Sequence, residues 1–236
     1  PPRSTLFPYT TLFRSDSMLE ETKLIQVKKE LMEFATLVES MVDKSVTGLK
    51  ERNTDQLKDV IERDEPRAND FETDLDERCV SIIAQHQPAG KSLRTILMVI
   101  HINSTLERIG DHAVTIAESG MFLADQPPVK QLIDIPHMAE VVKTMIADSI
   151  TSFINEDATL AKSVCERDDI VDGLRNQILR ELVTYMTADP ATIERSLQLM
   201  KISSNLERIA DLATNICEDV IYMVKGKVIK HHKDSL

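Results

Sequence analysis

The sequence predicts an all-α protein built from two tandem three-helix bundles, with six long helices in total. Three observations predict this fold class. Glycine and aromatic residues are scarce, with six Gly, no Trp and 4% aromatic residues among 236, whereas β-sheets favour β-branched and aromatic side chains. Apolar residues recur at three- and four-residue spacing, which is the period of an amphipathic helix. One stretch of sequence also recurs a hundred residues later, which indicates a duplicated helical unit.

Three helices are predicted in the first half, over 17–51, 54–86 and 92–123. Ser17 is the expected N-cap of the first helix. Asn53 precedes the second, and its side chain can accept a hydrogen bond from the first helical turn. Pro66 lies inside this second helix and should kink or break it, because proline has no backbone N–H. Pro88 and Gly90 separate the second helix from the third.

The second half repeats this order after Pro127 and Pro128, two consecutive prolines that cannot continue a helix. Its first helix is predicted over 130–155, with a start that Pro136 can delay. The next two helices are expected from the cap at Asn155–Asp157 to the break at Asp189–Pro190, and from there to Lys225, where Gly226 supplies a stop.

The prolines at 127 and 128 divide the chain into a first repeat over 16–125 and a second repeat over 126–236, which ends in a short basic tail. Segment 1–15 is set apart because it holds three of the nine prolines and no acidic residue. We interpret it as a translated cloning or sequencing-adapter sequence, with a disordered native tail as the alternative. It is excluded from the fold prediction.

The third helix of each half carries the clearest evidence of duplication. A shift of one hundred residues aligns 102–118 with 202–218, and ten of these seventeen positions are identical. The identical positions include the polar residues Glu107, Arg108 and Asp111. Amphipathicity alone would not reproduce polar residues in this way. We therefore expect two copies of one antiparallel three-helix unit.

Each copy places two carboxylates four residues apart, Glu107 with Asp111 and Glu207 with Asp211. Residues at this spacing are neighbours on a helix, and like charges there destabilise an isolated helix by about 0.2 to 0.5 kcal/mol. The apolar residues of the motif lie on a different stripe, which should face the core. We therefore expect a cation near each pair of carboxylates that compensates their charge.

Two kinds of cation could compensate. The first is the arginine within the motif, Arg108 or Arg208, in an ion pair on an ordinary charged surface. The second is a hard cation or iron held by carboxylate oxygens, with further ligands from a neighbouring helix.

The second helix of each repeat offers such further ligands. They are Asp168 and Asp172 in the second repeat, and Glu65 and Asn69 at the matching place in the first. The Glu-x-x-His motif of di-iron oxidase bundles is missing from the sequence.

Composition excludes several functional classes. The formal net charge of −11 argues against a nucleic-acid binder, which must neutralise phosphates. The longest apolar stretch, 95–106, is too short for a membrane span of about 20 residues. Cys79, Cys165 and Cys217 are scattered, and no signal peptide is recognisable, so we expect a cytosolic protein with free thiols. The sequence contains no nucleotide-binding P-loop and no Gly-x-Ser-x-Gly motif.

The repeated motif, Leu106 to Asp111 and again Leu206 to Asp211, together with Tyr222 to Gly226, resembles the PhoU family. The resemblance covers about Met18 to Lys230. It implies a cytoplasmic accessory regulator of phosphate transport that is not an enzyme and that restrains phosphate-starvation signalling. The implied partners are a phosphate ABC transporter with its ATPase subunit and the sensor histidine kinase of the phosphate two-component system. The resemblance places the protein at the inner face of the membrane and allows a homodimer.

The resemblance also implies multinuclear sites for iron or another divalent metal such as Zn, Mg or Mn. Carried onto this chain, the sites fall first on Glu107, Asp111, Glu207 and Asp211, then on Asp168 and Asp172, and then on Glu65 and Asn69. Ala210 replaces the family's usual glycine, and Pro66 interrupts the first-repeat segment. We therefore expect the second site to be the more intact. The alternative functions are a metal-binding or metal-storage bundle and an enzyme that uses a carboxylate-bound metal.

Overall fold

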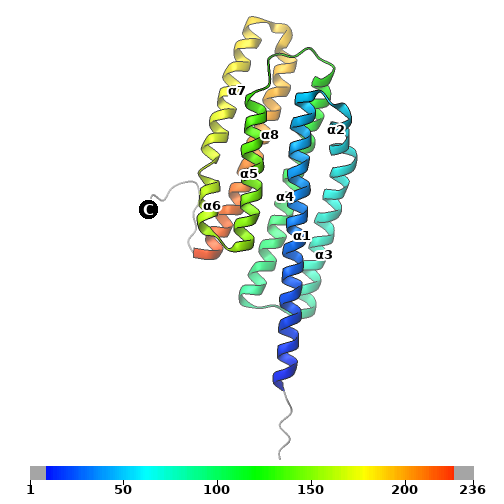
Figure 1. The fold of residues 1–236 in the computed structure, drawn as a ribbon, viewed down its shortest axis with the longest axis vertical. Coiled ribbons are helices and arrows are strands. Elements are labelled where there is room, and N and C mark those ends of the chain that lie inside the picture. The colour runs from blue at the N-terminus through cyan, green and yellow to red at the C-terminus, as the bar shows by residue number, and fades with distance from the viewer. Residues whose placement is uncertain (1–8, 226–236) are drawn as a thin grey trace, which may run out of the picture.

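The computed structural model describes the backbone of residues 9–225 and the side chains of residues 21–225. Every regular element within residues 9–225 is a helix, and the long helices lie side by side along one axis (Figure 1). The predicted all-α fold class is therefore confirmed. The predictions for residues 1–8, for the stop at Gly226 and for the basic tail fall outside the described residues.

The first repeat comprises α1 (Tyr9–Glu51), α2 (Thr54–Asp59), the π-helical turn η1 (Val60–Asp64), α3 (Glu65–His86) and α4 (Gly90–Ala124). The start of α1 at Tyr9 shows that the predicted start at Ser17 is wrong. Tyr9 is the first residue after the last proline of the N-terminal segment, and no residue between Tyr9 and Ser17 prevents a helix.

Pro66 interrupts the second helix through the π turn. The N–H of Glu65 donates to the carbonyl of Val60, five residues earlier. The α-helix then resumes with Pro66 in the first turn of α3, where its fixed φ suits a helix start. The expected local distortion at Pro66 is therefore confirmed, although the chain stays helical on both sides of it.

The second repeat comprises α5 (Asp134–Asn155), α6 (Ala158–Cys165), α7 (Asp168–Ala188), the 3-10 turn η2 (Pro190–Thr192) and α8 (Ile193–Lys225). Its first helix starts later than residue 130, with Pro136 in the first turn, as the proline suggested. A turn at Glu166 and Arg167 separates α6 from α7. No proline marks this break, and we did not predict it.

The predicted caps at the start of α2 and α6 both form. The side chain of Asn53 accepts from the backbone N of Gln56 at 3.2 Å. The side chain of Asp157 accepts from the backbone N of Thr159 and Leu160 at 2.9 and 3.0 Å. Each cap satisfies N–H groups that have no partner within the helix.

Four helices form the centre of the molecule. Contacts join α1 to α4, α4 to α8, α8 to α5 and α5 to α1. The α2–α3 pair flanks this central group on one side and the α6–α7 pair flanks it on the other (Figure 1). The buried faces of α4 and α8 include the repeated apolar residues Ile102, Leu106, Ile109, Ala113 and Ile116, and Ile202, Leu206, Ile209, Ala213 and Ile216.

Two side-chain contacts fix α4 and α8 in an antiparallel register. His101 Nε2 lies 3.0 Å from Asp219 Oδ2. Further along, His112 Nδ1 lies 2.8 Å from Asn205 Oδ1. Since Asn205 Nδ2 donates to the carbonyl of Lys201 at 2.8 Å, its Oδ1 is the acceptor for His112. Burial lowers the pKa of His112, which keeps this imidazole neutral between the repeats.

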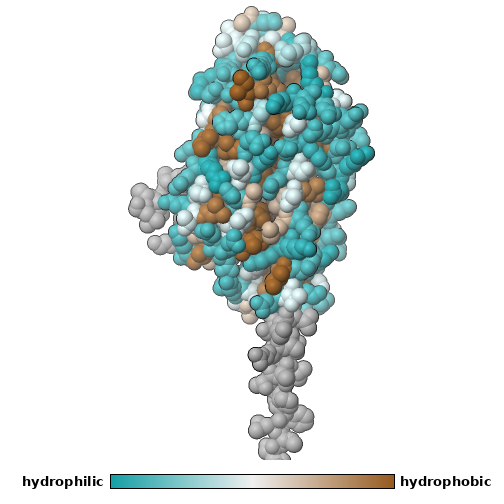
Figure 2. Space-filling view, viewed as in Figure 1, coloured by the Kyte–Doolittle hydropathy of each residue, from teal (hydrophilic) through white to brown (hydrophobic). Residues whose placement is uncertain are grey.

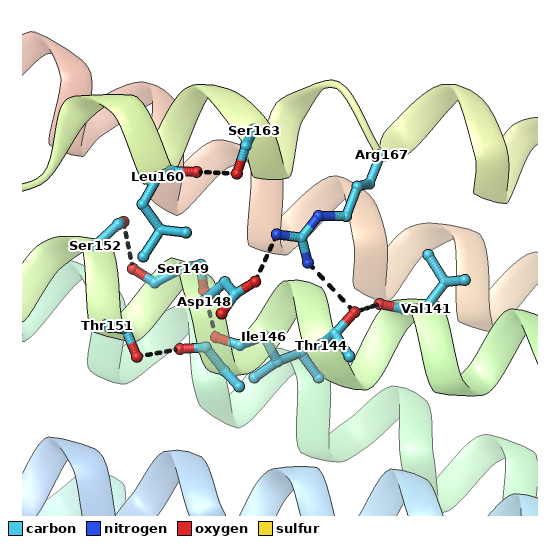
Figure 3. A network of polar contacts seen from close by, with 11 residues as sticks. Val141, Thr144, Ile146, Asp148, Ser149, Thr151, Ser152, Leu160, Ser163 and Arg167 are labelled. Atoms are coloured by element: carbon cyan, nitrogen blue, oxygen red, sulfur yellow. Dashed lines mark hydrogen bonds and ion pairs between the residues drawn. The ribbon is translucent and has the colours of Figure 1, made fainter.

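An ion pair with exchanged charges lies at the interruption of each second helix. In the first repeat, Lys44 Nζ of α1 lies 2.6 Å from Oδ2 of the buried Asp64. In the second, Asp148 Oδ2 of α5 lies 2.5 Å from an Arg167 guanidinium nitrogen (Figure 3). Arg167 also donates to Thr144 Oγ1 at 3.3 Å. The positive and negative residues have changed places between the repeats, but an ion pair is present in both. We therefore assign these pairs a structural role.

None of the helices between residues 9 and 225 has the apolar length that a bilayer crossing requires. The face shown in Figure 2 is largely polar, with separate apolar side chains between the polar ones.

Asp64→Ala is expected to lower the free energy of unfolding by about 2 kcal/mol, because Lys44 loses the carboxylate that it contacts in a largely buried position. Urea unfolding of the full chain measures this. Asp70→Ala, at an exposed position of α3, is the matched control and should change stability by less than about 0.5 kcal/mol. Equal effects of the two substitutions would contradict the structural role of the pair.

Candidate functional site

The first-repeat acidic surface consists of Glu72 and Asp76 of α3 with Glu107 and Asp111 of α4. Both pairs have the four-residue spacing that puts side chains next to each other on a helix. The fully buried Asn103 holds the two helices together beneath this surface. Its amide nitrogen donates to the backbone carbonyl of Glu72 at 2.8 Å and to Asp76 Oδ1 at 2.9 Å.

The carboxylates of this surface repel one another. Partial burial raises the pKa of Glu107, and the charges of Asp111 and Glu72 raise it further, as does a side-chain hydrogen bond with Asp111. Burial, then Asp76 and Asp111, likewise raise the pKa of Glu72. The positive charge of Arg108 lowers the pKa of Glu107, but this is the smallest of the contributions. This surface therefore carries negative charge that the protein itself compensates poorly.

The second-repeat acidic surface consists of Asp172 of α7 with Glu207 and Asp211 of α8. Burial and the charge of Asp211 raise the pKa of Glu207, and burial and Asp172 raise that of Asp211. Here Arg175 of α7 opposes both shifts. A positive side chain of the protein thus already lies among these carboxylates.

Arg175 occupies the place that Glu72 has in the first repeat. The buried positions of the two flanking helices have the same spacing, Ala68, Leu75 and Cys79 in α3 and Val171, Ile178 and Leu182 in α7. This register pairs Glu72 with Arg175 and Asn69 with Asp172. In this register, the segment from the Asn53 cap to α3 is one residue longer than the segment from the Asp157 cap to α7. The π turn η1 accommodates that residue.

The predicted site residues are thus only partly brought together. Glu107 with Asp111, and Glu207 with Asp211 and Asp172, lie in mutual electrostatic contact. Asp168 lies one helical turn before Asp172, where its charge acts on Cys165. Glu65 and Asn69 lie on α3 and make no side-chain hydrogen bond or ion pair with Glu107 or Asp111 within residues 21–225.

Glu72 and Asp76 were not among the predicted site residues. Both were visible as a Glu-x-x-x-Asp segment with the spacing of Glu107 and Asp111. The segment lies on the helix after Pro66, and only the packing of α3 on α4 shows that it faces the repeated motif. The local ion pairs proposed as the alternative, from Arg108 to Asp111 and from Arg208 to Asp211, are not formed in the described part of the chain.

The acidic surfaces fit a divalent cation by donor type but not by arrangement. Carboxylate oxygens are the ligands that hard cations prefer. Yet among the described residues no three His, Cys, Asp or Glu side chains converge closely enough to hold a metal ion. A bound cation would require these half-buried and exposed side chains to change rotamer.

Comparison with known proteins identifies a family. The family model for the PhoU domain matches the chain twice, over residues 31–120 and 135–220. A phosphate-specific transport system accessory protein PhoU homolog of Aquifex aeolicus is 41% identical over 209 residues, which cover 89% of this chain and 94% of that protein. The protein of that name from Pseudomonas putida is 38% identical, with coverage of 89% and 82%.

Solved structures show the same fold. PhoU from Pseudomonas aeruginosa superposes with a TM-score of 0.83 at 36% identity and covers 88% of this chain and 99% of its own. The phosphate transport system regulatory protein PhoU from Streptococcus pneumoniae superposes with a TM-score of 0.82 at 23% identity, over 90% of this chain and 100% of its own.

Glu107→Gln is expected to raise the free energy of unfolding at neutral pH by about 0.5 kcal/mol, because it removes one of the repelling charges and introduces an amide N–H that can donate to Asp111. A carboxyl group whose folded pKa is raised favours folding at low pH, and this contribution is lost as pH rises through the folded pKa. The gain from Glu107→Gln should therefore shrink on acidification. Urea unfolding at several pH values measures it.

Glu77→Gln, at an exposed position of α3, serves as the control and should leave stability nearly unchanged. A loss of stability in Glu107→Gln at neutral pH would show that the carboxylates of this surface do not repel one another.

Proposed function

Because the chain belongs to the PhoU family, we propose that it is an accessory protein of a phosphate transport system and acts by binding other proteins, without catalysing a reaction. The observation that carries this proposal is the match of the PhoU domain to both repeats. Relatives that share most of the chain's length bear the name of phosphate-specific transport system accessory proteins.

The proposed action is negative regulation of phosphate-starvation signalling. In this proposal the chain contacts a phosphate ABC transporter, including its ATPase subunit, and the sensor histidine kinase of the phosphate two-component system. A chain with a net charge of −11 is suited to basic patches on such partners. The contact with the ATPase subunit places the protein at the inner face of the membrane, in the cytoplasm.

The form of the acidic surfaces supports binding over catalysis. Enzyme sites are usually concave and mostly apolar, whereas both acidic surfaces lie along the outer sides of helix pairs. A cavity of about 420 Å³ is lined by residues of α1 and α4 together with Glu156, and it shares no residue with either acidic surface.

Deletion of the gene is expected to leave phosphate-responsive transcription switched on in phosphate-rich medium, because the proposed restraint on the sensor kinase is lost. A reporter fused to a phosphate-responsive promoter measures this, and the intact gene supplied in trans should restore repression. Normal repression in the deletion strain would refute the proposed regulatory role.

A second candidate is that the chain is a carboxylate-based metal-binding or metal-storage bundle for iron or another divalent metal such as Zn, Mg or Mn. The first-repeat acidic surface favours this candidate, because the charges of its carboxylates raise the pKa values of Glu72 and Glu107. A divalent cation would remove that repulsion. Glu65, Asn69 and, in the second repeat, Asp168 would be additional oxygen donors.

The two surfaces are expected to differ in metal content. Because Arg175 opposes the negative charge of the second surface only, Glu107→Ala with Asp111→Ala should remove more metal than Glu207→Ala with Asp211→Ala. Elemental analysis of protein purified without a histidine tag measures this.

The two double variants are matched controls for each other, since they change the same residue types at corresponding positions. The metal-binding candidate fails if the wild-type chain and both variants carry equally little metal. The predicted inequality fails if the second-repeat variant loses more.

A further inference from the structure

The cavity of about 420 Å³ lies between α1, the first turns of α4 and the turn that follows α5, which are found toward the same end of the molecule (Figure 1). Helices α1 and α4 belong to the first repeat, and Glu156 of that turn belongs to the second, so the cavity lies between the two repeats. Small-molecule sites in proteins usually have volumes of about 300 to 1,000 Å³. The cavity is therefore large enough for an organic ligand.

The hydroxyl of Thr95 is an unused hydrogen-bonding group in the wall of this cavity. Thr95 is only 6% exposed, yet its hydroxyl has no hydrogen-bond partner within residues 21–225. On the same helix, the hydroxyls of Thr105 and Thr115 donate to the carbonyl four residues earlier, at 2.9 and 3.1 Å. Thr95 does not make this bond.

The free hydroxyl of Thr95 faces the cavity. Its oxygen is not one of the unpartnered side-chain atoms that are closed off from all open space, and the cavity is the space that Thr95 lines. A buried polar group without a partner is unfavourable, so a ligand atom that forms a hydrogen bond with it is favoured.

The start of α4 supplies further hydrogen-bond donors beside the same space. The N–H groups of a first helical turn have no partner within the helix, and no side chain in the described part of the chain caps α4. Lys91 and Ser92 of this first turn line the cavity. The positive end of the dipole of a 35-residue helix therefore adjoins it. Phosphate groups bind at such helix starts.

The two lysines in the cavity wall differ in what they contact. Lys91 Nζ lies 2.8 Å from Glu156 Oε2, so these two charges compensate each other. Lys28 Nζ lies 5.5 Å from the centroid of the buried Phe153 ring and forms no ion pair with any residue between 21 and 225. Lys28 is therefore the positive charge that remains available to an anionic ligand.

The rest of the wall suits a carbon skeleton that carries hydroxyl groups. Glu21 can accept hydrogen bonds from hydroxyls, and the hydroxyl of Ser92 can donate or accept. Leu24 and Ile25 provide an apolar surface beside these polar groups. A purely apolar ligand would leave Glu21 and Ser92 without partners. Inorganic phosphate alone would leave most of the volume and the apolar side chains without contacts.

We propose that this cavity binds a small phosphorylated sugar or polyol. The phosphate group lies at the start of α4, where the N–H groups of the first turn, the Thr95 hydroxyl and the Lys28 ammonium donate to its oxygens. The hydroxyl groups of the ligand donate to Glu21, and its carbon skeleton packs on Leu24 and Ile25.

Isothermal titration calorimetry of the full-length chain with glucose 6-phosphate and with glycerol 3-phosphate tests the proposal. At least one of the two should bind with a stoichiometry of one. Inorganic phosphate and glucose should each bind at least about tenfold more weakly, because each offers only part of the contacts. Binding of neither phosphate ester, or equally tight binding of inorganic phosphate, would overturn the proposal.

Two variants with matched controls locate the site. Thr95→Val and Lys28→Gln should each weaken binding by at least about tenfold, because each removes a donor to a charged group. Thr105→Val changes a hydroxyl of similar burial on the same helix but outside the cavity, and Lys29→Gln changes an exposed neighbouring lysine. Both controls should alter the affinity by less than about twofold. Unchanged affinity in either Thr95→Val or Lys28→Gln would overturn the proposal.

Urea unfolding of the ligand-free variants separates the loss of a ligand contact from damage to the fold. Thr95→Val should leave the midpoint unchanged or raise it, because the hydroxyl has no bond to lose in the described structure. Thr105→Val should lower the midpoint, because its hydroxyl is bonded to the carbonyl of His101. If Thr95→Val does not fold, the partly buried Lys28 still provides the test through Lys28→Gln.

Discussion

The antiparallel packing of α4 on α8 is the constraint on which the rest of the molecule depends. Both helices carry the same apolar stripe, and each buries it in the centre of the molecule. His112 with Asn205 and His101 with Asp219 fix their register. Because the apolar faces of α4 and α8 are buried in this packing, the repeated carboxylates lie on the sides of these helices that face α3 and α7. Duplication of one helical unit thus produced both the core and two acidic surfaces.

The two repeats have diverged in two different ways. At the interruption of each second helix, Lys44 with Asp64 corresponds to Asp148 with Arg167, so the charges are exchanged and the attraction is kept. At the acidic surfaces, Arg175 corresponds to Glu72, and Asp172 corresponds to the uncharged Asn69, so one charge is reversed and one negative charge is added nearby. The first difference preserves stability. The second makes the acidic surfaces chemically unequal, because a positive side chain lies among the carboxylates of the second repeat only.

Sequence reasoning recovered the features that depend on local chemistry. Helical period, the caps at Asn53 and Asp157 and the distortion at Pro66 all follow from neighbouring residues. Whether Glu72 faces Glu107 depends instead on the orientation of α3 about its own axis relative to α4. A π turn adds one residue before α3, and one residue rotates a helix by about 100°, so spacing from the cap could not give this register.

We propose that this chain works by binding components of a phosphate transport system. The most direct test is affinity capture of the tagged full-length chain from cells grown with abundant phosphate, followed by quantitative mass spectrometry against cells that express the tag alone. We expect enrichment of the ATPase subunit of a phosphate transporter or of the sensor kinase. Capture of a folded chain with neither protein enriched would refute the proposed binding.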